Sequence, residues 1–326
     1  MQMRMITPLK WCVLLTVLLA ASAQLWAQPI AYGVNSRGNF VDSDRVNALW
    51  RIDLSTGAHE YIGWTSYLDL EALAFDPAGT LFGADDESKT LVRVSQVSGL
   101  AVPVGGAANR HNMRVSLRES MDFGMTFDCE GNAFVVSDIQ QSLFSADMET
   151  GRLTRIGQAG SLGAPITDIA TIGDKAFGIT TGGGTNGSAA ESSLYAVDLE
   201  NATAELIGPL GSDVSPYHNA GLAFDEDGVL WAITDRRAVT AGDFPSDILR
   251  IDPHTGQAEK VAETLVGVES LAIFPNASCQ TLGEPLPDDP EPESEVVAVP
   301  LLSLPGLLIL LILVLSLAWF QIRLRF

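Results

Sequence analysis

Cysteine, aromatic residues and positive charge are all scarce in this chain. Three cysteines and 7% aromatic residues in 326 positions exclude a small domain held together by a disulfide framework, because such domains are dense in cysteine. Nineteen basic residues stand against forty acidic ones, for a formal net charge of −21. A surface of that sign disfavours nucleic acid and anionic lipid and favours cations or basic partners. We therefore expect no nucleic-acid partner.

Common catalytic motifs are also missing. The sequence contains no Gly-x-Ser-x-Gly, no His-x-x-x-His, no Walker-type loop and no Cys-x-x-Cys. No segment between the two ends shows a long 3.6-residue apolar period, which excludes helical solenoids. His111 and His218 are expected to be exposed loop histidines, and Arg236-Arg237 a solvated pair. The sequence assigns no catalytic residue and favours binding over catalysis.

The amino-terminal end has the form of a signal peptide. Arg4 and Lys10 precede an almost wholly apolar run from Trp11 to Ala21. Cleavage could follow Ala23, after the small residues Ala21-Ser22-Ala23, or Ala27, because Leu25-Trp26-Ala27 also ends in a small residue. The run is shorter than the ~20 residues of a membrane span, so an uncleaved helix is the less favoured alternative. We assign residues 1–27 to the signal peptide and expect the rest of the chain to be exported.

The carboxyl-terminal end predicts a membrane helix on a stalk. Residues 301–320 carry no charge, and a segment of this length can cross a bilayer core. Arg323 and Arg325 follow, and positive charge favours the cytoplasmic side. Residues 283–300 are rich in proline and acid and are expected to form an extended spacer. Residues 301–326 would then anchor the globular part, residues 28–282, on the non-cytoplasmic side of the cell envelope.

This tail resembles a class of bacterial sorting signals. The segment Ala298-Val299-Pro300-Leu301-Leu302-Ser303-Leu304-Pro305-Gly306-Leu307, the apolar run and the short basic end are similar to tripartite signals of the IPTL-CTERM and PEP-CTERM type. Leu301 stands where that family has threonine, and Pro305-Gly306 replaces its tryptophan-glycine. The resemblance implies processing by an exosortase, a sorting protease, and release after cleavage. A plain membrane anchor is the alternative.

A repeat fills the middle of the chain. One motif, an apolar run ending in Asp or Ser, recurs at Leu49–Asp53, Leu91–Ser95, Leu143–Asp147, Leu194–Asp198 and Ile248–Asp252. A second motif, with a Phe-Asp pair before a glycine turn, alternates with it at 73–79, 125–131 and 222–228. Short apolar runs between such turns are typical of strands. Four strands in roughly 50 residues match the size of a propeller blade.

We therefore predict an all-β fold, a five-bladed β-propeller. The chain opens near Ile30 with what resembles the second strand of a unit and closes near Ile273 with what resembles a first strand, so the last strand should complete the first blade. Six blades and an open β-array are the alternatives. The repeat resembles the broad YVTN and lactonase-like class of bacterial propellers with a Leu-x-x-Ile-Asp-x-x-Thr-Gly turn. Binding modules, lactonases and quinoproteins all occur in that class, so the resemblance implies a fold and no substrate.

The repeat also sorts its connections onto two faces. Short turns lie at one face, and the long loops lie at the other, which are residues 35–48, 105–120, 181–193, 208–219 and 235–247. Function tends to sit on long loops held by a rigid scaffold, so we expect this face to bind a protein or glycan outside the cell. Cys129 and Cys279 fall on the short-turn face, where they either form a disulfide or remain two thiols.

Four carboxylates are candidates for a cation site. Alignment of the inward strands places Glu71, Asp168 and Glu269 at equivalent positions near the long-loop mouth of the channel, with Asp122 one residue earlier. Converging carboxylates suit calcium, and the alternative is carboxylates bonded to backbone or solvated at the rim. The leading interpretation is an envelope-anchored binding or scaffold module without a required cofactor. The alternatives are a cation-dependent hydrolase of lactonase type using these residues and a structural component of an extracellular matrix.

Overall fold

The computed structural model describes the middle of the chain, namely residues 29–35, 46–116, 122–181, 191–237, 244–275 and 277–283. The predicted signal peptide, the predicted membrane helix and the spacer beyond residue 283 lie outside these ranges. Among the described residues, no helix has the length and apolar character needed to cross a membrane.

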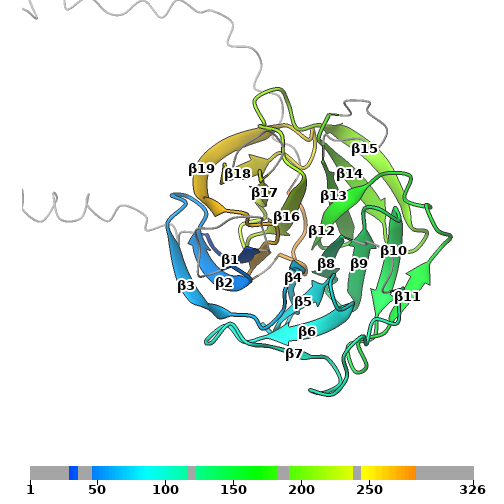
Figure 1. Ribbon diagram of the computed structural model, residues 1–326. Helices are drawn as coiled ribbons and strands as arrows, with labels where there is room; N and C mark the ends of the chain where they lie inside the picture. The colour runs from blue at the N-terminus through cyan, green and yellow to red at the C-terminus, as the bar shows by residue number, and fades with distance from the viewer. Residues whose placement is uncertain are drawn as a thin grey trace, which may run out of the picture. The chain divides into compact units, whose positions relative to one another are not determined.

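Five four-stranded antiparallel sheets, the blades, stand around a central axis (Figure 1). Blade 1 contains, from the axis outward, β20 (Ala272–Ile273), β1 (Ile30–Asn35), β2 (Ala48–Asp53) and β3 (His59–Trp64). Blade 2 contains β4 (Leu70–Phe75), β5 (Leu81–Asp85), β6 (Thr90–Val94) and β7 (Ala101–Pro103). Blade 3 contains β8 (Phe123–Phe127), β9 (Ala133–Ser137), β10 (Ser142–Ala146) and β11 (Leu153–Ile156). Blade 4 contains β12 (Ile166–Ile172), β13 (Lys175–Thr180), β14 (Ser193–Asp198) and β15 (Thr203–Pro209), and blade 5 contains β16 (Asn219–Phe224), β17 (Leu230–Asp235), β18 (Pro245–Ile251) and β19 (Ala258–Val266).

The ring closes between the two ends of the propeller, as predicted. Strand β20 pairs with β1 through Ala31 with Ile273 and Tyr32 with Ala272. The hydroxyl of Ser270 accepts a hydrogen bond at 3.0 Å from the backbone N–H of Val34, across 236 residues of sequence. The prediction of five blades is confirmed, and six blades and an open array are excluded.

The hydrophobic core is divided among the blade interfaces. Five clusters of buried apolar residues each combine side chains from two neighbouring blades. The inner strand β4 is buried along its whole length, whereas most of the outer strand β3 is exposed. This gradient explains the continuous apolar runs of the inner strands, because both of their faces pack against neighbours.

Close approach of the inner strands requires a glycine in β8. A Cβ built on Gly124 would lie 2.3 Å from Asp168 Cα on β12. Real atoms do not approach so closely, so β8 and β12 can pack at this distance only with a residue that lacks a side chain. The tight contact brings the backbone of β8 within reach of the carboxylate of Asp168.

The short-turn face carries the repeated Asp-x-x-Thr-Gly turns. In the β10–β11 turn, the Asp147 carboxylate accepts hydrogen bonds from the Thr150 hydroxyl at 2.6 Å and the Glu149 backbone N–H at 2.9 Å. These bonds lower the pKa of Asp147. Gly151 closes the turn at φ 80°, which other residues adopt only with strain. The sequence signature of the repeat is therefore a hydrogen-bonded turn rather than a binding motif.

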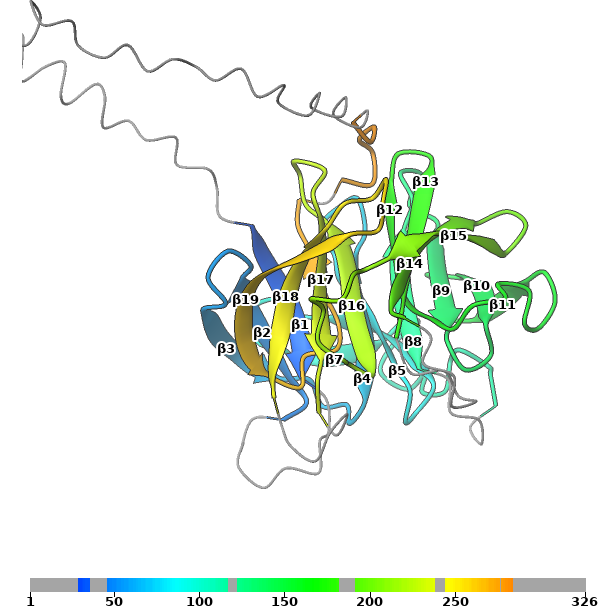
Figure 2. The same cartoon turned by 90° about the horizontal axis from the view of Figure 1, so that it is seen from above.

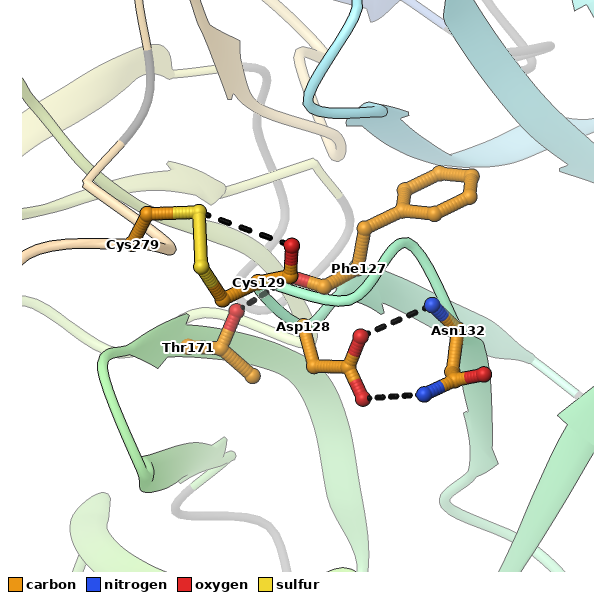
Figure 3. The surroundings of a disulfide bond; sticks show 6 residues. All are labelled: Phe127, Asp128, Cys129, Asn132, Thr171 and Cys279. Atoms are coloured by element: carbon orange, nitrogen blue, oxygen red, sulfur yellow. Dashed lines mark hydrogen bonds between the residues drawn. A yellow bond between two sulfur atoms is a disulfide. The ribbon is translucent and has the colours of Figure 1, made fainter.

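A disulfide fastens the end of the described chain to the short-turn face (Figure 3). Cys129, in the β8–β9 turn, is bonded to Cys279, with the two Cα atoms 4.6 Å apart, so the disulfide alternative for this pair is confirmed. Next to Cys279, the backbone carbonyl of Ser278 accepts a bond at 2.9 Å from Gly173 N–H in blade 4. In Figure 2 the start of β1 and this orange segment lie on the same side as the β12–β13 turn. The segment thus ties blades 3 and 4 together on the short-turn face.

Candidate functional site at the long-loop mouth of the channel

The four predicted ligands all lie toward the long-loop end of the inner strands. Glu71 lies at a bulge in β4, and Asp122 directly precedes β8. Asp168 lies within β12, and Glu269 lies three residues before β20. Their protein contacts, however, divide them into three separate environments.

Asp168 lies one residue deeper than its expected equivalence with Glu71. Ala72 pairs with Ala84, which follows the Phe-Gly pair of β5, and Asp168 pairs with Ile179, which follows the Phe-Gly pair of β13. Asp168 is therefore equivalent to Ala72. Both strands carry a bulge at the same position, Glu71 in β4 and Thr167 in β12. The alignment of the apolar residues was therefore one residue out at Asp168, and Thr167 is the true equivalent of Glu71.

The carboxylate of Asp168 joins three inner strands. Its Oδ1 accepts backbone N–H bonds from Met125 at 3.0 Å and Ile169 at 2.8 Å. Its Oδ2 accepts from Leu222 N–H in blade 5 at 2.6 Å. Burial raises the pKa of Asp168 well above its ordinary value, against the effect of these bonds. The arrangement matches the alternative interpretation, in which the carboxylate is bonded to neighbouring backbone.

Glu71 and Asp122 form a close acidic pair. Glu71 Oε2 accepts a bond from the backbone N–H of Phe123 at 3.0 Å. Burial, followed by the charges of Asp122 and Glu269, raises the pKa of Glu71 well above its ordinary value. Burial and Asp86 raise the pKa of Asp122, while its hydrogen bond with Glu71 lowers it. Shared protonation is the ordinary result when two carboxyl groups lie this close.

Two further carboxyl groups at the mouth make stability depend on pH. Burial and the charge of Asp122 raise the pKa of Asp138 to about 7, and burial with Asp86 raises that of Asp69 to about 6. Between pH ~4 and ~7 the folded chain therefore holds protons that the unfolded chain releases. We expect the urea midpoint to fall as pH rises through this window.

Two variants separate this effect from general charge repulsion. Asp138→Asn removes one of the groups and should flatten the dependence on pH between 5 and 7. Asp198→Asn serves as control, because hydrogen bonds from Asn201 lower the pKa of this exposed turn residue and its titration lies outside the window. Parallel midpoint curves for Asp138→Asn and the unmodified chain would contradict the assignment.

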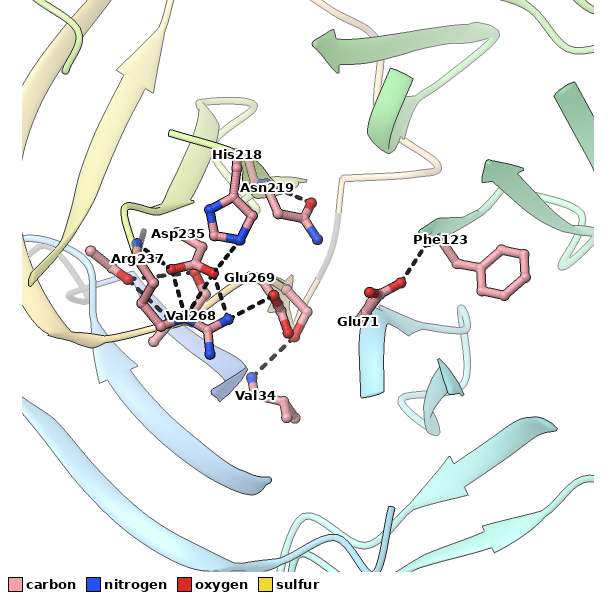
Figure 4. A network of polar contacts seen from close by, with 12 residues as sticks. Val34, Glu71, Phe123, His218, Asn219, Asp235, Arg237, Val268 and Glu269 are labelled. Carbon is pink, nitrogen blue, oxygen red and sulfur yellow. Dashed lines mark hydrogen bonds and ion pairs between the residues drawn. The ribbon is translucent and has the colours of Figure 1, made fainter. Parts of the chain in front are cut away.

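A second polar network surrounds Arg237 on the opposite side of the mouth from Glu71 (Figure 4). The guanidinium donates from Nε to both carboxylate oxygens of Asp235 at 2.9 Å and from Nη2 to Asp235 Oδ2 at 2.5 Å. Nη2 also donates to Glu269 Oε2 at 3.0 Å. His218 Nε2 lies 3.1 Å from Asp235 Oδ2. Burial would raise the pKa of Asp235, but the hydrogen bonds from His218 and Arg237 hold it below its ordinary value.

Arg236 and Arg237 are paired rather than solvated, so that prediction was wrong. Arg237 is only 7% exposed in its side chain and Arg236 15%. Arg236 Nη1 donates to Asp247 Oδ1 at 3.0 Å, and its guanidinium lies 5.2 Å from the ring centre of Phe244. Both arginines therefore belong to the packed mouth.

The sequence reasoning missed Asp235, although a signal was present. Asp235 ends the second strand of blade 5, as Asp85 ends that of blade 2, and both ends face the long-loop side. His218 was correctly expected on an exposed loop and is 49% exposed. His111 lies away from this network, with its imidazole Nδ1 against the carbonyl of Ser88. The mouth therefore contains one of the two candidate histidines.

Comparisons with known proteins show no matching family and a distant likeness to a solved structure. No family model matches the chain, and no curated protein matches it. Among solved structures, the chain is similar to Kuenenia stuttgartiensis hydrazine synthase, with 14% identity, coverage of 69% of this chain and 68% of that chain, and a TM-score of 0.39. A likeness at this level carries no argument about function, and the propeller assignment rests on the sheet topology.

Proposed function

We propose that this chain is an exported propeller, held at the cell envelope by its C-terminal segment, that binds a protein or glycan through its long-loop face. The observation that carries the proposal is the separation of the two faces. One face consists of tight hydrogen-bonded turns, and the other bears the longer connections and a mouth lined by buried polar groups. A rigid scaffold that presents elaborated loops on one side suits recognition.

The acidic character of the chain sets the kind of partner. Charge complementarity steers association, so a basic protein surface or a glycan bound with cations fits a chain of net charge −21. The hydrolase alternative, with Glu71, Asp122, Asp168 and Glu269 around one ion, is less well supported. Asp168 accepts three backbone bonds and Glu269 pairs with Arg237, so both carboxylates have protein partners. The matrix alternative predicts that deleting the protein alters the extracellular matrix.

Matched charge reversals on the two faces test the binding proposal. Glu191 and Asp213 are exposed on the long-loop face, and Glu149 and Glu200 are exposed on the short-turn face. The full chain would be passed over immobilised envelope protein and envelope polysaccharide from the source cells. We expect the double substitution Glu191→Lys, Asp213→Lys to weaken binding at least about tenfold. Equal binding by this variant and by Glu149→Lys, Glu200→Lys would contradict the choice of face.

Export and anchoring need a separate measurement. The mass of the mature protein from fractionated cells reports both ends at once. We expect loss of about the first 27 residues and recovery in the membrane fraction, or a shortened carboxyl end if a sorting protease acts. A full-length mass in the cytoplasmic fraction would refute this part of the proposal.

A further inference from the structure

Three side chains with metal-ligating atoms converge at the long-loop mouth (Figure 4). One ligand atom each from His218, Asp235 and Glu269 lies within 4.8 Å of the others. They come from three places in the chain, which are the β15–β16 loop, the end of β17 and the segment before β20. Asp235 and Glu269 are buried, and the half-exposed imidazole connects the group to solvent.

The chemistry of this set differs from that of the acidic pair across the mouth. One imidazole nitrogen with two carboxylates is a ligand set that zinc accepts in proteins, with water in the fourth position. Calcium prefers six to eight oxygen ligands, and three side chains including an imidazole do not supply them. The class of ion that fits is therefore a divalent transition metal.

The guanidinium of Arg237 occupies the position between the two carboxylates where an ion would bind. Its Nη2 touches both carboxylates, at 2.5 Å from Asp235 and 3.0 Å from Glu269. Two carboxylates against one guanidinium leave one negative charge when the imidazole is neutral. A divalent ion in place of the guanidinium would neutralise both carboxylates, whereas the arginine neutralises only one of the two.

We propose that His218, Asp235 and Glu269 form a zinc site for which Zn²⁺ competes with the side chain of Arg237. In the arginine-filled state, His218 Nε2 carries the proton that it shares with Asp235. To ligate zinc through Nε2, the imidazole must carry its proton on Nδ1, so the tautomer changes and no net proton is released. Arg237 then sets the affinity, because its guanidinium must leave the two carboxylates before the ion enters.

The first test uses the unmodified full chain, freed of metal by chelator and titrated with zinc chloride in a calorimeter. We expect saturable binding of one ion per chain, at least about tenfold weaker in His218→Ala. His254→Ala is the matched control, since His254 is an exposed histidine in the β18–β19 turn on the opposite face. Calcium chloride should not compete. Absence of saturable binding, or equal affinity in His218→Ala and His254→Ala, would overturn the proposal.

The second test removes the competitor. Arg237→Met keeps much of the side-chain length without the charge, and we expect it to bind zinc about 100-fold more tightly than the unmodified chain. The melting temperature of Arg237→Met should rise with zinc, and that rise should vanish in the double variant with His218→Ala. If Arg237→Met folds only with zinc, the proposal is supported. If Arg237→Met does not fold even with zinc, Arg237→Lys is measured in its place. If the folded Arg237→Lys chain, or the folded Arg237→Met chain, binds zinc no more tightly than the unmodified chain, the competition is refuted.

Discussion

Cys129→Ser is expected to lower the melting temperature by roughly 10–20 °C. The disulfide joins residues 150 positions apart, and in the chain-entropy account a loop of that length contributes about 5 kcal/mol by restricting the unfolded chain. For a domain of this size each kcal/mol corresponds to about 2–4 °C. Thermal unfolding followed by circular dichroism, without reductant, measures the change.

The single variants Cys129→Ser and Cys279→Ser and the double variant show whether the loss comes from the disulfide bond itself. Cys279→Ser and the double substitution should each match Cys129→Ser within about 1 kcal/mol, because either change removes the whole disulfide. Reducing the unmodified chain should reproduce the same loss. Additive losses in the double variant would show that the thiols contribute through packing rather than through the bond.

The second large effect is expected at Asp168. Asp168→Ala leaves the buried backbone N–H groups of Met125, Ile169 and Leu222 without their acceptor. An unsatisfied buried donor costs about 1–3 kcal/mol, so we expect the free energy of unfolding to fall by about 3 kcal/mol or more. Urea unfolding of the purified chain gives the value.

Neighbouring substitutions show whether the loss is specific to the carboxylate. Asp168→Asn keeps one acceptor oxygen and should fall between the unmodified chain and Asp168→Ala. Thr167→Val changes an equally buried neighbour whose hydroxyl donates to the carbonyl of Ile179 at 3.3 Å, and should cost about 1 kcal/mol or less. If Thr167→Val is as damaging as Asp168→Ala, the three hydrogen bonds do not explain the effect.

The number of blades could be predicted from the sequence because its signals are local. In the turns at Asp53, Asp147 and Asp252, the carboxylate accepts hydrogen bonds from residues two or three positions away. Each turn can therefore be recognised from a few consecutive residues of the sequence. Ring closure followed from comparing the first and last apolar runs with a repeat already recognised. Neither step required knowledge of distances between blades.

The site was harder to predict because it depends on register between strands. The bulges at Glu71 and Thr167 are not visible in the alternation of apolar residues, and without them the alignment placed Asp168, rather than Thr167, opposite Glu71. The contact between Arg237 and Glu269 joins positions 32 residues apart through the packing of two blades. A single sequence holds no pairing information of that kind, so the four carboxylates were grouped although their partners differ.

The closing strand also sets the order in which the molecule can be completed. Strand β20 holds two residues and is made almost at the end of the propeller, so during synthesis the inner edge of β1 lacks its neighbouring strand until β20 is made. An open strand edge is a template for pairing with another chain. We therefore expect chains truncated before residue 272 to associate with one another. In the full chain, the Cys129–Cys279 disulfide can form only after β20 has been made, and it then covalently holds the closed ring.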